Sequence, residues 1–528
     1  MNRFALLLLA LPAICYGQAN IFDNLSWSAK GSHANQSLGA SGLDYIGYVN
    51  DTIQHAFALG EDGGSSYVFN RKAGDTTRQF KFPGHKVFRA NFDGNLYPDF
   101  LCWDGAQIKM LLGTAKIDSF HVVELHGDVN KDDFRYLDGR ICVIDANVDG
   151  YDDVLVDEMS HDTPRFIMFK GGLIPDSTVS VAKDGNLGEW YYGALLQSGR
   201  VKDTSQQFLL SMRFTGPEVK LGTADSAEIY RFKLGSQFNL IPDDTVYCTL
   251  DTPRYCCMNY TDFVVMDIDN DGIDDLCFAG YDNTYKPSLM VDPTVFVYKG
   301  GATISPLPTY FFHRPHQTNS SEFGSKIADL GNLTGRGYHT IAITDPDASD
   351  GGDENGAVFL YNIGRALKDS CVAYGVGPQQ YMDKFGTNII SLGDSEFAVG
   401  ADADSIAIGA FDHGGRIFVF HGSSSYGPIV SVNEQATLPN QVILAQNYPN
   451  PFSISTTLAF LLQNSGEAHA VLSVYDMIGR EIARIYDGPT NQAPRTARFS
   501  AKSLQAGNYV VRLTAGGRTT ERIMQIVK

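Results

Sequence analysis

A short acidic loop recurs between apolar runs, and it restricts the possible fold more than any other feature of the chain. Three copies lie at 91–99, 145–153 and 267–275. Each carries oxygen-bearing side chains at positions 1, 3, 5 and 9, and a glycine at position 4 or 6 permits the tight turn. The flanking runs, such as Phe263–Met266 and Leu276–Ala279, are short and strand-like. The loop therefore joins two β-strands.

The oxygen atoms of these loops match what a hard cation such as calcium requires, which is a set of six to eight oxygen ligands. The twelfth position, where a helix–loop–helix calcium site carries glutamate, holds Cys102, Val156 or Phe278. We expect Ca²⁺ in a structural role. Because Asp, Asn and Gly also favour turns, a plain hairpin satisfied by water and backbone is the alternative. The candidate ligands, with position 7 contributing its backbone carbonyl, are Asn91, Asp93, Asn95, Tyr97, Asp99, Asp145, Asn147, Asp149, Tyr151, Asp153, Asp267, Asp269, Asp271, Ile273 and Asp275.

A longer repeat organises the chain from about residue 22 to residue 425. Each copy contains a strand, an acidic turn, an apolar strand and a closing apolar-aromatic strand, of which Phe166–Phe169 and Val295–Tyr298 are clear examples. The turns lie near residues 44, 91, 145, 203, 267, 332 and 394, at spacings of 47 to 65 residues. A unit of that size holds four short strands, which is one blade of a β-propeller. The seven units predict an all-β fold built on a seven-bladed β-propeller.

Two places in the repeat are less regular. The fourth unit, from Tyr191 to Phe232, is the weakest, because its turn near Asp203 is not a recognisable metal loop. The apolar strand after Ile21 is expected to close the ring by pairing with the last blade.

Two later copies carry a resemblance to a known family. Phe323-Gly324 precedes Asn332–Gly337 and Ile341–Ile343, and Phe385-Gly386 precedes Ile406–Ala410. Together with the acidic loops, these motifs resemble the FG-GAP repeats of integrin α-chain propellers and of bacterial surface proteins, over about residues 22–425. The resemblance implies calcium in the hairpins of some blades, on the face opposite the usual ligand-binding face.

The resemblance carries over to individual loops unevenly. Blades two, three and five keep the calcium motif. In blade six, Arg336 and Thr340 stand where oxygen ligands belong. In blade seven, Asp394 is followed by Ser395 and Glu396 in poor register, so no calcium is expected there.

The beginning of the chain is typical of a secretory signal peptide. Arg3 precedes an apolar run to Ile14, and small residues follow, which predicts a signal peptide over 1–17 with Ala19 as an alternative cleavage point. Cys15 raises the alternative of a lipoprotein, although Ile14 occupies the place of an expected small residue. No other segment is apolar enough to cross a membrane.

Charge and composition limit the partners of the chain. The 53 glycines and 12% aromatic residues, with only 19% charged residues, suit an all-β protein with many turns. The net charge of −19 argues against nucleic acid or an anionic membrane surface as a direct partner. Residues 440–528 hold nine Lys and Arg against five Asp and Glu, a net of +4, which leaves −23 for residues 1–439. This asymmetry indicates a domain boundary.

The C-terminal segment has a pattern of its own. A linker over 426–439 leads to alternating strands with turns between them, which predicts a small Ig-like β-sandwich over 440–528. Asn447–Phe452, Val471–Asp476, Gly479-Arg480 and Leu504–Tyr509 occur in this order. They resemble the type A C-terminal sorting domain of the type IX secretion system. The resemblance implies recognition by the secretion machinery, export across the outer membrane, and release or anchoring at the cell surface.

The cysteines do not suggest chemistry. Cys102, Cys142 and Cys277 lie within apolar strand runs and are expected to be buried. Cys248 is a candidate for a local disulfide with Cys256 or Cys257, between which the spacing does not choose.

Catalytic motifs are missing from the sequence: it has no His-Glu-x-x-His helix, no Gly-x-Ser-x-Gly elbow and no Gly-Lys phosphate loop. Three weaker candidates for function remain. His313 and His316 could hold a metal, and two of the carboxylates Asp347, Asp350, Asp353 and Glu354 could act as glycosidic acid and base. The aromatic residues Trp190, Tyr191, Tyr192, Tyr281 and Tyr285 could bind sugars, but for all three groups a role as surface or packing residues is the simpler interpretation.

These observations predict a secreted or cell-surface adhesion protein that binds a glycan or protein partner without catalysis, with calcium stabilising its propeller. The alternatives are an extracellular polysaccharide lyase or hydrolase with its site in the propeller channel, and a passive surface-layer component. The fold alone does not choose between them.

Overall fold

The protein is described from a computed structural model. The structure describes residues 19–30, 43–47, 56–61, 65–70, 78–84, 86–115, 119–127, 140–160, 163–184, 195–215, 223–255, 262–280, 294–315, 322–334, 339–349, 355–363, 371–377, 384–393, 395–401, 415–426, 441–444, 447, 452–463, 469–489, 495–501, 504–515 and 518–527. The predicted signal peptide and the predicted linker after Tyr426 lie outside these residues.

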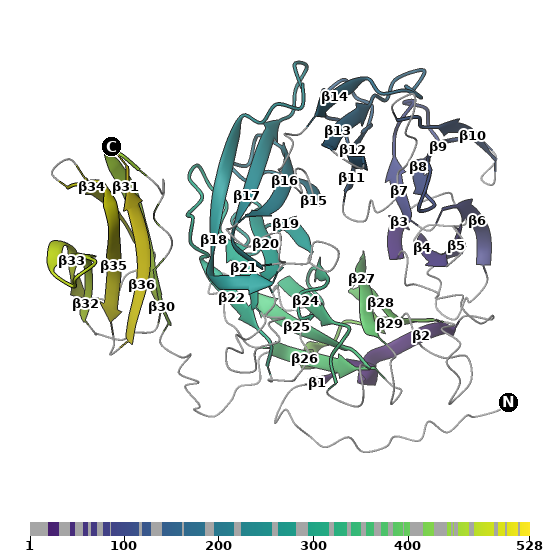
Figure 1. The fold of residues 1–528 in the computed structure, drawn as a ribbon. Coiled ribbons are helices and arrows are strands. Elements are labelled where there is room, and N and C mark those ends of the chain that lie inside the picture. The colour runs from purple at the N-terminus through teal and green to yellow at the C-terminus, as the bar shows by residue number, and fades with distance from the viewer. Residues whose placement is uncertain are drawn as a thin grey trace.

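The described chain between Ala19 and His421 forms seven antiparallel sheets (Figure 1). Three are β3 (Leu43–Gly47), β4 (Ala56–Glu61), β5 (Ser65–Asn70) and β6 (Arg78–Pro83); β7 (Lys86–Ala90), β8 (Asp99–Trp103), β9 (Ile108–Gly113) and β10 (Phe120–Glu124); and β11 (Ile141–Ile144), β12 (Asp153–Ser160), β13 (Thr163–Phe169) and β14 (Val181–Asp184). Two more are β15 (Leu195–Gly199), β16 (Phe208–Thr215), β17 (Thr223–Lys233) and β18 (Asp244–Tyr255); and β19 (Phe263–Met266), β20 (Asp275–Gly280), β21 (Thr294–Tyr298) and β22 (Tyr310–His313).

The last two sheets also take strands from the N-terminal segment. One consists of β23 (Ile327–Asp329), β24 (His339–Asp345), β25 (Ala357–Ile363) and β26 (Cys371–Val376), with β1 (Ala19–Asn20) parallel to β26. The other consists of β27 (Phe385–Gly393), β28 (Glu396–Ala401) and β29 (Arg416–His421), with β2 (Leu25–Lys30) antiparallel to β29. The expected pairing of the strand after Ile21 with the last sheet is thereby confirmed. A 3₁₀ turn, η1 (Ile21–Asn24), joins β1 to β2, and another, η3 (Ser424–Tyr426), follows β29.

The sheets form a closed circuit through their first strands. β3 contacts β7, and the contacts continue through β11, β15, β19 and β23 to β27, which contacts β3. Figure 1 shows the sheets radiating from a common centre in this order. Each sheet therefore occupies the place of a propeller blade, and we number the blades one to seven from the sheet that begins with β3.

The strands are apolar because both faces of a sheet pack against neighbouring sheets. One core cluster joins Leu210 and Ile229 of blade four to Phe278 and Phe296 of blade five. Another joins blade five to blade six through residues such as Val295 and Ile343. Burial on both faces gives the continuous apolar runs that made these strands recognisable in the sequence.

Two details of the expected repeat were wrong. The apolar-aromatic strands that the sequence analysis placed last, such as Phe166–Phe169 in β13, are third strands, and a fourth strand follows each except β29, whose outer neighbour is the N-terminal β2. Some fourth strands are less apolar because they form an exposed outer edge: His121, Val122 and Glu124 of β10 are exposed, and its other two residues are intermediate. The fourth strands β22 and β26 are instead largely apolar and buried. The turn predicted near residue 44 is also wrong at that position, because Asp44 lies within β3; residues 48–55 lie outside the described residues.

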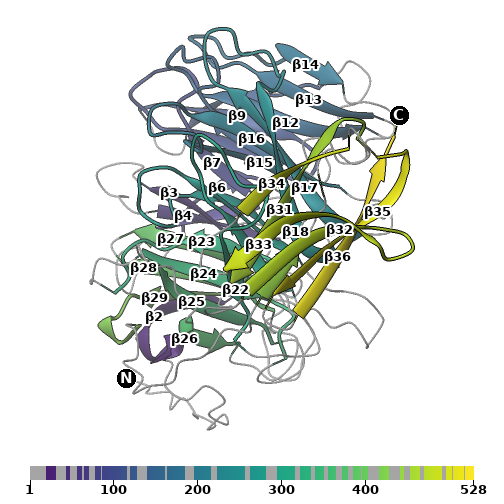
Figure 2. The same ribbon diagram turned by 90° about the vertical axis from the view of Figure 1, so that its left-hand side faces the viewer.

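The C-terminal strands form two further sheets that share one core. One is β30 (Gln441–Leu444), β31 (Ser455–Gln463) and β34 (Arg495–Ser500); the other is β33 (Glu481–Pro489), β32 (His469–Asp476), β35 (Gly507–Ala515) and β36 (Arg518–Ile526). Leu458 and Phe460 of the first sheet pack with Leu472 and Leu513 of the second. These strands (yellow in Figures 1 and 2) form the predicted β-sandwich.

The described cysteines are all buried, and Cys102, Cys142, Cys248 and Cys277 are free thiols. Cys102, Cys142 and Cys277 are buried as predicted, and burial raises the pKa of the Cys142 thiol to about 12. The possible disulfide of Cys248 is not formed, because Cys248 is a free thiol in the core between blades four and five.

Candidate metal sites

The three acidic loops lie at equivalent places, each between the first and second strands of its blade. They connect β7 to β8, β11 to β12, and β19 to β20. In all three, the backbone N–H of position 7 donates to the side-chain oxygen of position 5. The distances are 2.6 Å from Tyr97 to Asn95, 3.0 Å from Tyr151 to Asp149, and 2.9 Å from Ile273 to Asp271. The sequence motif therefore corresponds to one recurring backbone shape.

The ninth position is a buried aspartate with two backbone partners. Asp275 accepts a hydrogen bond from the N–H of Ile268 at 3.0 Å and another from Gly300 at 2.8 Å. Asp99 and Asp153 accept the equivalent pairs. Each carboxylate thus joins its own loop to the end of the third strand. Burial, the largest cause, raises the pKa of Asp153 and of Asp275 to about 7, and raises that of Asp99 above its usual value.

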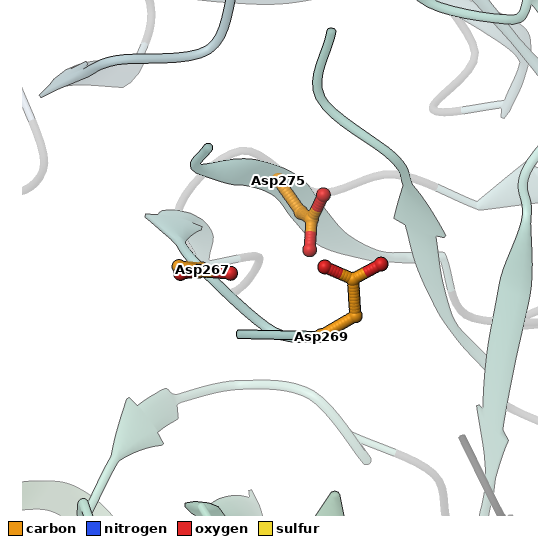
Figure 3. A group of neighbouring side chains, drawn as sticks. All are labelled: Asp267, Asp269 and Asp275. Carbon is orange, nitrogen blue, oxygen red and sulfur yellow. The ribbon is translucent and has the colours of Figure 1, made fainter. Parts of the chain in front are cut away.

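Blade five brings three carboxylates together. One oxygen of each of Asp267, Asp269 and Asp275 lies within 4.8 Å of the other two, and among the described residues this is the sole such group of three possible metal ligands. Figure 3 shows the carboxyl groups of Asp269 and Asp275 pointing toward one another. Oδ1 of Asp269 is buried without a hydrogen-bond partner. An unsatisfied buried carboxylate oxygen beside two further carboxylates fits a bound cation.

A lysine neutralises part of the same loop. The ammonium group of Lys299, at the end of β21, forms an ion pair with Asp269 and lies 2.9 Å from Oδ2 of Asp271. These hydrogen bonds raise the pKa of Lys299, and the bond from Lys299 lowers the pKa of Asp271. Asp271 therefore faces Lys299 and does not belong to the group of three carboxylates.

Blades two and three keep the loop but not the cluster. In blade three, the two oxygens of Asp145 accept the N–H groups of Asp149 and Gly150 at 3.0 and 2.9 Å. The side chain of Asn147 donates to Asp149 at 2.8 Å. Asp267 in blade five accepts the equivalent N–H groups, of Asp271 and Gly272, at 3.0 and 2.8 Å, so these bonds belong to the shape of the turn in both blades.

In blade two, the first position points away from its loop. Asn91 Nδ2 lies 3.4 Å from the carbonyl oxygen of Gly150 in blade three. Asn95 donates to Asp93 at 2.8 Å and to the carbonyl oxygen of Gly113 at 3.1 Å. Asn91 is thus not brought together with Asp93 and Asp99.

The loops without the motif are held by other bonds. Asp203 in blade four accepts from the backbone N–H groups of Ser205 and Gln206 at 2.8 and 3.1 Å. Thr340 in blade six is buried and donates to Asn362 at 2.9 Å. In blade seven, Glu396 lies 2.8 Å from His421. Arg336 and Asp394 lie outside the described residues.

Position 8 has a role that the sequence analysis missed. Asp152 accepts the backbone N–H of Asn91 at 2.8 Å and donates its own N–H to the carbonyl oxygen of Asn91 at 2.9 Å. Asp274 makes the same two bonds to Arg200, at 2.6 and 3.1 Å. In blades three and five, the eighth aspartate therefore joins the loop to the preceding blade. The pair of aspartates at positions 8 and 9 was visible in the sequence. The sequence did not show that the side chain at position 8 bonds to the neighbouring blade.

A second group of charges lies on the opposite face, because it is built from loops that follow second and fourth strands. Arg314 after β22 forms a buried ion pair with Asp345 of β24 at 2.7 Å. Asp347 forms an ion pair with Lys384 before β27. Glu322 lies beside Asp347, and burial, followed by the charge of Asp347, raises the pKa of Glu322 to about 7.

Most of the weaker candidates from the sequence fall outside the described residues. These are His316, Asp350, Asp353, Glu354, Trp190, Tyr191, Tyr192, Tyr281 and Tyr285. His313 is described on β22, where its ring stacks on Phe311 and lies 3.4 Å from Thr294.

The C-terminal domain matches a known protein family. Residues 446–527 match the family of the Secretion system C-terminal sorting domain. The match indicates export to the outside or to the surface of the cell, and it implies contact with the secretion machinery. The described residues contain no helix long and apolar enough to span a membrane.

Part of the chain is similar to integrins. Mouse integrin alpha-8 (Mus musculus) is 28% identical over 231 residues, which is 40% of this chain and 20% of the relative. Human integrin alpha-8 (Homo sapiens) is 29% identical over 194 residues, 35% of this chain and 17% of the relative. The chain thus spans about a fifth of the length of these relatives. The similarity supports the FG-GAP resemblance of the repeats.

Solved structures with related architecture share little sequence with the chain. BBS1N in complex with ARL6DN covers 75% of this chain and 96% of its own length, at 9% identity and a TM-score of 0.42. The β-propeller domain of Cps50 (Swd1) from Myceliophteria thermophila covers 75% and 99%, at 10% identity and 0.38. PorZ, a surface component of the type IX secretion system of Porphyromonas gingivalis, covers 92% and 58%, at 12% identity and 0.31.

Proposed function

We propose that the chain is a calcium-stabilised, seven-bladed β-propeller that binds a glycan or protein partner outside the cell without catalysis, in an adhesion or capture role. The proposed division is a signal peptide over 1–17, a propeller over 22–425, a linker over 426–439 and a sorting domain over 440–528. The sorting-domain match and the integrin similarity support this assignment.

The observation that carries the calcium part is the blade-five cluster. Asp267, Asp269 and Asp275 present carboxylate oxygens within 4.8 Å of one another, and Oδ1 of Asp269 is buried without a partner. Equivalent ions are proposed in blades two and three, whose loops have the same backbone shape. The side chains at positions 1, 3, 5 and 9 and the carbonyl of position 7 would hold each ion. Its chemistry would be structural, since it would neutralise the carboxylates and stiffen the hairpin.

The proposed binding face is the one opposite the calcium loops. In an antiparallel blade, loops after the first and third strands lie on one face, and loops after the second and fourth strands lie on the other. The calcium loops occupy the first face, so the second is left for a ligand. The integrin-like repeats support the same division of faces.

A glycan and polysaccharide binding screen of the mature chain, with calcium and with chelator, tests the binding role. Calcium-dependent binding of a defined sugar that is recovered intact supports the proposal. Degradation of the bound polysaccharide contradicts it. The absence of binding under both conditions turns the search to protein partners.

One observation favours the enzymatic alternative. Glu322 and Asp347 are neighbouring carboxyl groups on the proposed ligand face, and the pKa of Glu322 is raised to about 7. A carboxyl group that keeps its proton near neutral pH beside a second carboxyl group is an arrangement found in polysaccharide hydrolases. Under this alternative, Glu322→Gln abolishes polysaccharide cleavage; under non-catalytic binding, neither the wild type nor the variant cleaves.

A further inference from the structure

A lysine that follows the third strand of blade five reaches the acidic loop of the same blade. Lys299 comes directly after β21 and before Gly300. The N–H of Gly300 donates to Asp275 at 2.8 Å, and a Cβ atom added at Gly300 would lie 2.2 Å from the carbonyl oxygen of Asp274. The end of the strand thus packs directly against the loop, and glycine permits this close approach. The backbone that flanks Lys299 therefore holds it beside the acidic side chains.

Lys299 binds oxygens that belong to the proposed calcium ligands. Its ammonium group forms an ion pair with Asp269 and lies 2.9 Å from Oδ2 of Asp271. The other oxygen of Asp271, Oδ1, accepts the N–H of Ile273 at 2.9 Å. Both oxygens at position 5 therefore already have partners, whereas Oδ1 of Asp269 at position 3 is buried without one.

The loops of blades two and three use a side-chain amide where blade five uses Lys299. In blade three, Asn147 at position 3 donates to Oδ2 of Asp149 at position 5, at 2.8 Å. In blade two, Asn95 at position 5 donates to Oδ2 of Asp93 at position 3, also at 2.8 Å. Blade five has aspartate at both positions, and an ionised carboxylate cannot donate. Lys299 supplies the donor that this pair of positions lacks.

Blade three also carries a lysine at the equivalent place, which makes the two blades a matched pair. Lys170 precedes two glycines after β13, as Lys299 precedes two glycines after β21. Lys170 forms no ion pair within the part of the chain that the structure describes. The carboxylate of Asp149 is bonded to Asn147 instead. The lysine therefore engages the loop in the blade whose positions 3 and 5 are both acidic.

We propose that Lys299 is a built-in counter-ion of the blade-five loop, which holds Asp269 and Asp271 together when no ion is bound and competes with calcium for these two carboxylates. This inference rests on the calcium site of the proposed function. The affinity of a calcium loop depends on the charge of its ligands. With all four proposed carboxylates ionised the loop carries −4, and the ammonium group reduces this to −3 (−4 + 1). Lys299 therefore weakens calcium binding while it stabilises the loop without calcium.

These two effects have opposite signs, which distinguishes a counter-ion from a lysine that only packs. Lys299→Met removes the charge with little change in side-chain length. It should tighten calcium binding at blade five about fivefold, because the lysine no longer competes for the carboxylates. It should lower the Tm in chelator by about 1–2 °C, because Asp269 and Asp271 lose their counter-charge. Loss of packing alone would lower the Tm equally in chelator and in calcium and leave the calcium affinity unchanged.

The test combines calorimetric calcium titration of the chelator-treated full chain with thermal unfolding in chelator and in saturating calcium. Lys299→Arg keeps the charge and should titrate like the wild type. Lys170→Met removes the equivalent lysine of blade three and should also titrate like the wild type. In an Asp269→Ala background, which leaves no ligand at position 3, Lys299→Met should no longer change calcium uptake. This last result would assign the effect to blade five.

Each outcome of the titration decides for or against the counter-ion. An unchanged or weaker affinity in Lys299→Met would overturn it, while uptake by the wild type would leave the calcium site of the proposed function standing. An equal gain of affinity in Lys170→Met would overturn it too, because the effect would then be one of general surface charge. Uptake by Lys299→Met but not by the wild type would support the competition. Uptake by neither would remove both the calcium site and the competition.

Discussion

At the scale of single residues, the aspartates at positions 9 and 3 of the blade-five loop, Asp275 and Asp269, have different roles. Asp275 is 2% exposed and accepts two backbone N–H groups, so it is structural whether or not an ion is bound. Asp269 has a buried oxygen without a partner. The sequence predicts both as ligands through their spacing. It cannot separate them, because one partner of Asp275, the N–H of Gly300, lies 25 residues away in the sequence.

We therefore expect a contrast between two substitutions in this loop. Asp275→Asn should lower the free energy of unfolding by about 2 kcal/mol in calcium and in chelator, because the amide has one acceptor oxygen and leaves the buried N–H of Ile268 or of Gly300 without a partner in both. Asp269→Asn should be destabilising in calcium but change stability by less than about 0.5 kcal/mol in chelator, where it loses a half-exposed ion pair. Urea unfolding under both conditions measures the difference. Equal losses from Asp269→Asn in both would contradict its assignment as a ligand.

Glu322 predicts a pH dependence of stability. Its folded pKa of about 7 exceeds the ordinary value of 4.5, so the folded state holds a proton that the unfolded state releases. The free energy of unfolding therefore falls as the pH rises from about 4.5 to 7. Glu322→Gln, which mimics the protonated form, should match the wild type near pH 4.5. It should be more stable by about 1 kcal/mol at pH 8, after allowance for solvent screening. Thermal unfolding across this range is the measurement, and parallel curves would contradict the assignment.

At the scale of the elements, the acidic loops connect blades as well as strands. Position 8 accepts a backbone N–H of the preceding blade at Asp152 and again at Asp274. Strand periodicity and turn residues made the blades predictable, because each apolar strand is buried on both faces. Fourth strands such as β10 and β14 were missed because their exposed residues lack that signal. The contacts between loops were missed because they join segments about 60 to 74 residues apart.

Removing the position-8 carboxylate should loosen a junction between blades. Asp152→Ala should lower the free energy of unfolding by about 1 kcal/mol in calcium and in chelator, because the amide of Asn91 loses its acceptor. Hydrogen exchange should show faster exchange of that amide, while the amide of Arg200, held by Asp274, stays protected as an internal control. Unchanged protection of the Asn91 amide would contradict the claim that Asp152 holds the two blades together through this hydrogen bond.

At the scale of the whole molecule, the N-terminal segment completes the ring. β2 pairs with β29 of blade seven, and Phe22 packs against Phe385, Phe418 and Phe420 with centroid separations of 5.3 to 5.7 Å. The sequence indicated this closure, since an apolar strand without a blade of its own precedes the first repeat.

A chain that begins at residue 31 should therefore lose much of its stability. Burial of Ile21 and Phe22 alone corresponds to about 3–6 kcal/mol, and removal of β2 exposes the edge of β29. A chain that begins at residue 19 is the control and should unfold like the full chain. Thermal unfolding with light scattering compares the two. Equal Tm values would contradict closure by β2.

The most direct test of the central claim is calorimetric titration of calcium into the chelator-treated full chain, beside Asp269→Asn. We predict three sites for the wild type, in blades two, three and five, with Kd values of about 10⁻⁴–10⁻³ M. Asp269→Asn should bind one ion fewer. Saturation at 10 mM calcium should stabilise the fold by about 1.4–2.7 kcal/mol per site. A wild type that takes up no calcium at 10 mM, or a variant with an unchanged stoichiometry, would contradict the account.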